Sequence, residues 1–251
     1  FGLFFARKLY RMNLLTIADF YRERYDRKVE VITGVAIALS YLGWVSAQIT
    51  ALGLVFNVLS DGQITQAQGI MIGAAVVLMY TLYGGMWSVA LTTFFQMIVI
   101  VLGLFYIAWL VTDLTGGVAP VVQHAVENNK FRFWPELNAV AMVAFISGLL
   151  TMGFGSIPQQ DVFQRANSSK NENVAVWGTV GGGIAYFLFA AVPLFLTYSA
   201  LLVDPSMAQH FLEVDAQKIL PLLVSGHLPL LAQVIFYGAL LSVIMSTASG
   251  T

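Results

Sequence analysis

The chain alternates long uncharged apolar stretches with shorter segments that hold most of its charged residues. A helix that crosses a hydrocarbon core about 30 Å thick needs about 20 apolar residues, and lipid forces such a segment to pair its own backbone groups. The pattern therefore predicts six membrane-spanning helices. The boundary between the second and the third lies at Tyr83, Gly84 and Gly85. The expected spans are residues 31–60, two within 62–112, 137–162, 174–203 and 229–250.

Composition supports this interpretation and excludes several classes of protein. Apolar residues make up 58% of the chain and charged residues 10%, against roughly 45–50% and about 25% in soluble domains. A net charge of -1 gives no reason to expect nucleic acid as a partner, because that binding depends on clustered basic residues. No nucleophile, base and orienting group are spaced to meet, so we do not expect an enzyme. The expected partner is the lipid bilayer, and no obligate protein partner is evident.

Basic residues predict the orientation, because cytoplasmic loops near helix ends are enriched in them. Residues 6–30 and 164–173 contain nine of the twelve basic residues, so we place both segments in the cytoplasm of a plasma membrane, with a bacterial inner membrane as our expectation. Thr16 and Asp19 have capping-box spacing, which predicts a short helix in the first segment. That helix is expected in the loop, and lying on the membrane surface is the alternative. The nine residues are Arg7, Lys8, Arg11, Arg22, Arg24, Arg27, Lys28, Arg165 and Lys170.

The last span carries hydroxyl groups on one helical face. Ser242, Ser246 and Ser249 follow each other at i, i+4 and i+7. Oxygen ligands suit a hard cation, so the carbonyl of Val243 and the hydroxyls of Ser246 and Thr247 are candidates for one side of a sodium site. The alternative is that these hydroxyls only bond the carbonyl one turn back or hold neighbouring helices together.

The fourth span contains two glycines and a proline within residues 153–158, so a regular helix is not expected to persist there. Transporters use such interruptions to expose backbone groups to substrates and ions, although a packing kink without a ligand would show the same pattern. Asp161 and Arg165 stand at i, i+4 and predict an ion pair. The candidate solute-binding residues here are Gly155, Ser156, Gln159 and Gln160.

The first span presents Tyr41, Trp44 and Gln48 along one face, at i, i+3 and i+7. Aromatic rings attract organic cations through cation–π contacts, so Trp44 and Gln48 are further candidates for solute binding. Ordinary aromatic packing between helices is the alternative interpretation.

Residues 83–96, Tyr-Gly-Gly-Met-Trp-Ser-Val-Ala-Leu-Thr-Thr-Phe-Phe-Gln, resemble the signature of the sodium:solute symporter family, which has paired glycines, a small residue and a downstream Thr-Asp-x-x-Gln. Residues 159–165 resemble the family's segment that ends in Gln-Arg after a broken helix. Ser246 and Thr247 fall where family members have the hydroxyl pair of a sodium site. The resemblance runs along essentially the whole chain.

This resemblance implies an all-α membrane protein with a five-plus-five inverted-repeat, LeuT-like core. Residues 1–251 would form a single transmembrane domain fragment, from the end of core helix 2 through core helix 8. The implied function is sodium-coupled symport of a small organic solute by alternating access, with sodium co-transported rather than held as a prosthetic group. The implied sodium ligands are Val243, Ser246 and Thr247.

Two positions depart from the family pattern. Thr93 stands where many relatives have Asp, which argues against a second cation site that uses that carboxylate. The choline transporter branch is most similar in residues 156–158, in residues 219–221 and at Trp44, but Gln159 stands where that branch has Trp. A sensor domain of a signalling protein, a channel and proton coupling remain as alternatives.

Overall fold

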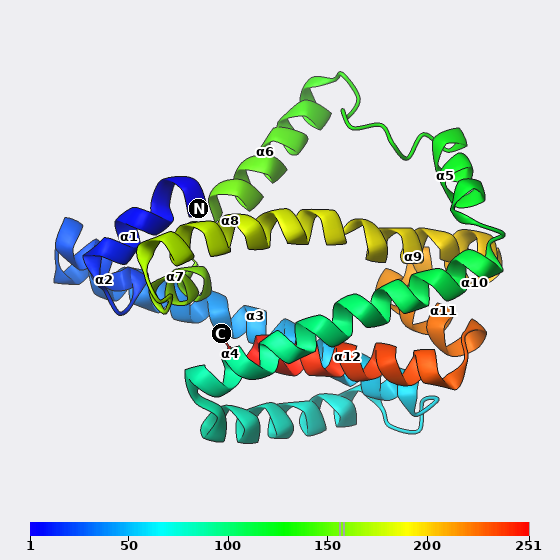
Figure 1. The fold of residues 1–251 in the computed structure, drawn as a ribbon, viewed down its shortest axis with the longest axis horizontal. Coiled ribbons are helices and arrows are strands. Elements are labelled where there is room, and N and C mark those ends of the chain that lie inside the picture. The colour runs from blue at the N-terminus through cyan, green and yellow to red at the C-terminus, as the bar shows by residue number, and fades with distance from the viewer. Residues whose placement is uncertain (156, 158, 251) are drawn as a thin grey trace. The chain divides into compact units, whose positions relative to one another are not determined.

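The computed structural model describes residues 1–155, 157 and 159–250, and the side chains of these residues except 80, 83–89 and 249. The regular elements in this part of the chain are all helical (Figure 1). In chain order they are η1 (Gly2–Ala6), α1 (Arg7–Met12), α2 (Ile17–Arg24), α3 (Arg27–Leu59), α4 (Gln66–Leu114), α5 (Val118–Glu127), α6 (Ala139–Gly155), α7 (Gln160–Asn167), α8 (Glu172–Phe189), α9 (Ala191–Val203), α10 (Pro205–Val214), η2 (Ala216–Lys218), α11 (Ile219–His227) and α12 (Leu230–Ser249).

Within the described residues, five helical segments are long and apolar enough to cross a membrane, in agreement with five of the six expected spans. The other expected span corresponds to Gln66–Met79, the first part of α4, which is a shorter apolar helix. After this part the ribbon of α4 turns back, so that Gln66–Met79 and Ala90–Leu114 run in opposite directions (Figure 1). The five segments are Arg27–Leu59, Ala90–Leu114, Ala139–Asn167, Glu172–Val203 and Leu230–Ala248.

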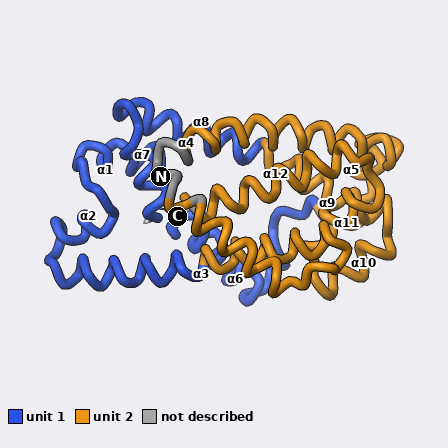
Figure 2. The backbone as a smooth tube through the Cα atoms, turned by 90° about the horizontal axis from the view of Figure 1, so that it is seen from below, with its two compact units in different colours: residues 1–43, 131–188 blue, residues 44–130, 189–251 orange. Residues whose placement is uncertain are grey.

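The chain divides into two compact units (Figure 2). The first contains residues 1–43 and 131–188, and the second contains residues 44–130 and 189–251. Helix α3 begins in the first unit and ends in the second. Each unit has its own cluster of buried apolar side chains.

The second unit is built around an antiparallel pair, the Ala90–Leu114 part of α4 and α12. Thr93 lies beside Ser246, whereas Gly103, ten residues later, lies beside Ile235, so the two helices run in opposite directions. A Cβ on Gly103 would lie 2.5 Å from Cγ2 of Ile235, so the glycine permits the close approach. Helices α3, α9, α10 and α11 contribute further buried residues to the core of this unit. Its largest fully buried apolar side chains are Leu52, Val55, Ile107, Val111, Leu196, Leu223 and Val224.

A second close crossing joins α3 to the first part of α4. A Cβ on Gly53 would lie 2.8 Å from the carbonyl oxygen of Gln66, and one on Gly69 would lie 2.9 Å from the Cα of Gly53. Real Cβ atoms do not approach backbone atoms so closely, so the crossing requires both glycines. Small residues at such contacts let membrane helices pack with their backbones close together.

The first unit has a small buried cluster and much exposed apolar surface. Leu9, Ile17 and the fully buried Phe163 form the cluster, and Ile37 of α3 packs against it. Helix α6 has no buried residue, although it is strongly apolar. Apolar side chains all around a helix are typical of a helix that faces lipid.

Candidate functional site

The hydroxyl of Ser246 lies on the face of α12 that meets α4. The Ser246 side chain is 7% exposed, and its Oγ lies 2.9 Å from Oγ1 of Thr93, with either hydroxyl able to donate the hydrogen bond. Helix α12 is continuous over this region, so Ser242 and Ser246 have the i, i+4 spacing that the sequence predicted. The Ser246 hydroxyl therefore points into protein, as an ion site requires.

Val243, one turn before Ser246, lines an apolar cavity of about 190 Å³ between α4 and α12. Gly103, Ile107 and Ile235 also line this cavity. The Val243 side chain is a hydrocarbon, so the only ligand atom that this residue can offer a cation is its backbone carbonyl oxygen. A helical carbonyl has a second lone pair beside the one that accepts the N–H four residues later.

Three oxygen atoms that can bind a cation thus come from about one turn of α12. They are the carbonyl oxygen of Val243 and the hydroxyl oxygens of Ser246 and Thr247. Residues three and four apart on a helix are neighbours on its surface. Neutral carbonyl and hydroxyl oxygens suit hard cations. The chemistry of this turn therefore fits one side of a sodium site, and the hydroxyl of Thr93 adds a fourth oxygen next to it.

The fourth span is interrupted, as the sequence predicted. Helix α6 ends at Gly155 and α7 begins at Gln160. The N–H of Ile157 donates to the carbonyl of Phe154 at 3.1 Å, which forms a turn after α6. Gly153, which the sequence placed in the interruption, still belongs to α6. Ser156, a candidate solute-binding residue, and Pro158 lie outside the described residues.

Helix α7 is tied to the rest of the first unit by its polar side chains. Asp161 and Arg165 form the expected ion pair, with Nη1 of Arg165 3.0 Å from Oδ2 of Asp161. Gln160 accepts a hydrogen bond of 2.8 Å at Oε1 from the backbone N–H of Ile17, at the start of α2. The amide oxygen of Gln160 is therefore engaged in the fold, whereas Gln159 is exposed.

The other candidate solute-binding residues lie on exposed or partly exposed positions. Trp44 is 52% exposed on α3, and Gln48 is half-buried one turn further along the same helix. Trp44 and Gln48 belong to the second unit, as do the candidate sodium ligands. Gly155, Gln159 and Gln160 belong to the first unit.

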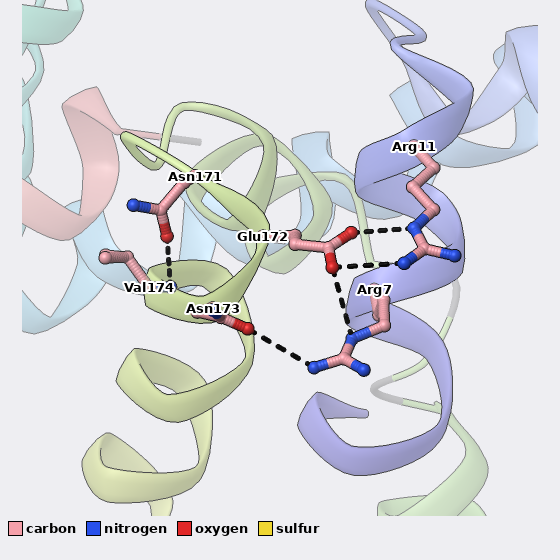
Figure 3. A network of polar contacts seen from close by, with 6 residues as sticks. All are labelled: Arg7, Arg11, Asn171, Glu172, Asn173 and Val174. Carbon is pink, nitrogen blue, oxygen red and sulfur yellow. Dashed lines mark hydrogen bonds and ion pairs between the residues drawn. The ribbon is translucent and has the colours of Figure 1, made fainter.

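The two basic segments of the first unit contact each other through an ionic network (Figure 3). Arg11 of α1 forms a bidentate contact with Glu172 at the start of α8, at 2.7 and 3.1 Å. Arg7 lies 3.7 Å from the same carboxylate and donates to Oδ1 of Asn173 at 3.3 Å. The hydrogen bond from Arg11 to Glu172, and the negative charge of that carboxylate, raise the pKa of Arg11 above its ordinary value.

Further contacts join the same two segments. The hydroxyl of Tyr10 donates to the carbonyl of Ser169 at 3.2 Å, and Nδ2 of Asn167 donates to the carbonyl of Leu14 at 3.0 Å. The expected capping box at Thr16 is present at the start of α2. Both basic segments therefore lie next to each other within the first unit.

Sequence reasoning missed several long-range polar pairs, and two of them involve candidate site residues or their neighbours. It did not pair Tyr41 with Asp161, and it did not connect Thr93 with Ser246. The members of these pairs are separated by 120 and 153 positions along the chain. The spacing of neighbouring residues cannot reveal such partners. The only signal in the sequence was Thr93, which stands where many relatives have Asp.

The comparisons with known proteins identify the family of the chain. The family model for the sodium:solute symporter family matches residues 1–251. The high affinity choline transporter 1 of Homo sapiens is 24% identical over 264 residues, which cover 100% of this chain and 44% of the relative. The choline transporter of Caenorhabditis elegans is 27% identical over 213 residues, covering 83% of this chain and 35% of the relative.

A bacterial relative is similar over a shorter length. The osmoregulated proline transporter OpuE of Bacillus subtilis (strain 168) is 24% identical over 162 residues, covering 63% of this chain and 32% of the relative. The chain thus spans less than half the length of these curated relatives. The apolar helical spans show that the chain is an integral membrane protein. Because the family model matches all of its residues, the chain belongs to the sodium:solute symporter family, which is a family of transporters and not of enzymes.

Proposed function

We propose that the whole protein carries out sodium-coupled symport of a small organic solute across the plasma membrane by alternating access. Membership of the sodium:solute symporter family supports this proposal. Sodium would be co-transported, and it would not be a resident cofactor. The remaining partner is the lipid bilayer around the apolar spans.

The proposed sodium ligands are the carbonyl of Val243 and the hydroxyls of Ser246 and Thr247. The observation that carries this assignment is the buried hydroxyl of Ser246, which lies 2.9 Å from the hydroxyl of Thr93 where α12 packs against α4. A buried polar group needs compensating partners. A sodium ion would use these oxygens as ligands, and it would be dehydrated only where several of them converge.

The proposed solute is a small organic molecule, with choline as the first candidate and proline as the second, because relatives carry these names. Trp44 could hold a cationic headgroup by cation–π attraction. Gln159 could donate and accept hydrogen bonds, which favours a solute with a polar group. The proposed solute-binding residues are Trp44, Gln48, Gly155, Ser156, Gln159 and Gln160.

Coupling follows if sodium binding favours the conformation in which the solute site is complete. Each ligand then lowers the dissociation constant of the other by the same factor, because binding free energies are linked reciprocally. Downhill entry of sodium would thereby drive uphill entry of the solute.

Uptake by the full-length protein in proteoliposomes tests this proposal. Labelled choline and labelled proline are supplied with a sodium gradient or with equimolar potassium, and the initial rates are compared. We expect uptake of one solute to require sodium, and Ser246→Ala to raise the sodium concentration for half-maximal uptake about tenfold, as expected for one lost ligand of a charged group. Equal uptake in sodium and potassium would overturn sodium coupling.

Ser199→Ala is the matched control for Ser246→Ala. Ser199 is fully buried in the same unit, but its hydroxyl donates to the carbonyl of Phe195 within its own helix. We expect this variant to keep the sodium dependence of the wild type. An unchanged sodium dependence in Ser246→Ala would remove the site assignment even if uptake itself requires sodium.

We further propose that residues 6–30 and 164–173 face the cytoplasm. The ion pair between Arg11 and Glu172 supports a shared side for these segments, and the basic bias supports the cytoplasm. Single cysteines at Lys170 and Lys130 in a cysteine-free background test this orientation. A membrane-impermeant maleimide added to intact cells should label Lys130→Cys and not Lys170→Cys. The reverse labelling would invert the topology.

A further inference from the structure

Helix α7 begins without a cap of its own. The first four N–H groups of a helix have no partner within the helix and need other acceptors. Gln159 occupies the N-cap position of α7, and its side chain makes no capping hydrogen bond. The backbone amides at the start of this short helix therefore depend on groups from elsewhere in the unit.

Tyr41 of α3 supplies the missing cap. Its hydroxyl oxygen accepts the backbone N–H of Asp161 at 3.0 Å, and the same hydroxyl donates to Oδ1 of Asp161 at 2.8 Å. The arrangement is reciprocal, as in a capping box, but the cap comes from another helix. The second carboxylate oxygen of Asp161 binds Arg165 at 3.0 Å, so both oxygens of the carboxylate are engaged.

Three further contacts limit how α7 can move within the first unit. Oε1 of Gln160 accepts the N–H of Ile17, and Asn167 donates to the carbonyl of Leu14 at the other end of α7. Phe163, in the middle of α7, is fully buried. The remaining polar side chain at the first turn, Gln159, is exposed.

We propose that Tyr41 is a positioning residue, which caps the second half of the broken span and thereby holds Gln159 in place for the solute. This inference rests on the proposed function, because Gln159 has a role only if the interruption contacts the solute. Tyr41 itself need not touch the solute. Its hydroxyl fixes the backbone that carries Gln159, because two hydrogen bonds from one rigid ring define both the position and the direction of the first turn.

Tyr41→Phe tests the proposal, because it removes only the hydroxyl. We expect the solute concentration for half-maximal uptake to rise about tenfold, in line with the loss of two hydrogen bonds, while the maximal rate stays near that of the wild type. Sodium binding without solute, measured as the rise of the unfolding temperature on adding sodium, should be unchanged. A fall in maximal rate with unchanged half-saturation would indicate a purely structural role and overturn the proposal.

Tyr186→Phe is the matched control, since Tyr186 is 78% exposed on α8 of the same unit. A second test acts on the partner of Tyr41. Asp161→Ala removes the acceptor and should raise the half-saturation for the solute, whereas Arg165→Gln breaks only the ion pair and should not. Equal effects of these two variants would assign the role to the ion pair rather than to Tyr41.

Amide hydrogen exchange provides a readout that does not require the solute to be known. In the full-length protein, Tyr41→Phe should speed exchange in peptides that cover residues 159–163, and Tyr186→Phe should not. Unchanged exchange there would overturn the capping role. Uptake by the wild type that does not require sodium would instead overturn the proposed function and leave the capping result standing.

Discussion

The hydroxyl oxygens of Thr93 on α4 and Ser246 on α12 lie 2.9 Å apart, although 153 positions separate the two residues in the chain. This contact connects the Ser246 hydroxyl to α4 within the helix pair. Ser246 is one of the three proposed sodium ligands, so the Thr93 hydroxyl is placed to orient it.

Thr93→Val should therefore weaken sodium binding while the fold is retained, because valine has nearly the same shape as threonine but no hydroxyl. We expect the sodium concentration for half-maximal uptake to rise about threefold to tenfold, as expected for one lost hydrogen bond. The sodium dependence of uptake by the full-length protein measures this effect. Thr112→Val is the control, because Thr112 of the same helix donates to the carbonyl of Ala108, one turn back. Equal shifts in both variants would contradict the orienting role.

The crossing of α3 and α4 predicts a strong effect of small substitutions. Gly69→Ala would place a methyl group 2.9 Å from the Cα and the carbonyl oxygen of Gly53. Neither backbone atom can move away without separating the helices, so we expect the variant to lose about 1–3 kcal/mol of stability, as overpacked contacts do. The unfolding temperature in detergent, followed by tryptophan fluorescence, measures the loss.

Gly34→Ala is the control for this crossing. Gly34 lies on α3, the helix that contains Gly53, and a Cβ at Gly34 would meet nothing within 4 Å. We expect this variant to be unchanged or slightly more stable, because alanine favours helix over glycine by roughly 0.5–1 kcal/mol. A loss as large as that of Gly69→Ala would contradict the role of the close approach, because a methyl group at Gly34 meets no neighbouring atom.

The ionic network of the first unit predicts a charge-reversal rescue. Arg11→Glu and Glu172→Arg should each lower the unfolding temperature at low salt, because each brings like charges together across the contact between α1 and α8. The double variant restores opposite charges and should recover most of the loss. Adding salt should shrink all three differences, because exposed ion pairs are screened. Additive losses in the double variant would show that the two side chains do not interact.

A buried hydroxyl ties α11 to α12 in the second unit. Tyr237 is 4% exposed, and its hydroxyl donates to the carbonyl of Pro221 at 2.8 Å. Tyr237→Phe should therefore lower the stability by about 0.5–1.5 kcal/mol, as for a typical lost hydrogen bond. The unfolding temperature measures this change, and exposed Tyr186→Phe should show none. An unaltered unfolding temperature in Tyr237→Phe would mean that the bond adds nothing.

The sequence by itself determined the features that depend on neighbouring residues. Of the six spans that the apolar runs predicted, five are long and apolar enough to cross a membrane within the described residues. The glycines and the proline near residue 155 predicted the interruption, and local spacing predicted both the capping box at Thr16 and the ion pair between Asp161 and Arg165. The sequence did not predict that the fifth span divides at Ala190 into α8 and α9. Pro193 lies just after this division, where its missing N–H disfavours a continuous helix.

Only the tertiary structure decided which helix faces meet. Thr93 pairs with Ser246, Tyr41 with Asp161 and Arg11 with Glu172, across 153, 120 and 161 positions. Apolar faces of membrane helices are nearly equivalent, because lipid tails solvate them as well as another helix does. The choice of partner therefore depends on close packing at a few glycines and on scattered polar pairs, and both require the three-dimensional arrangement of segments that are distant in the chain.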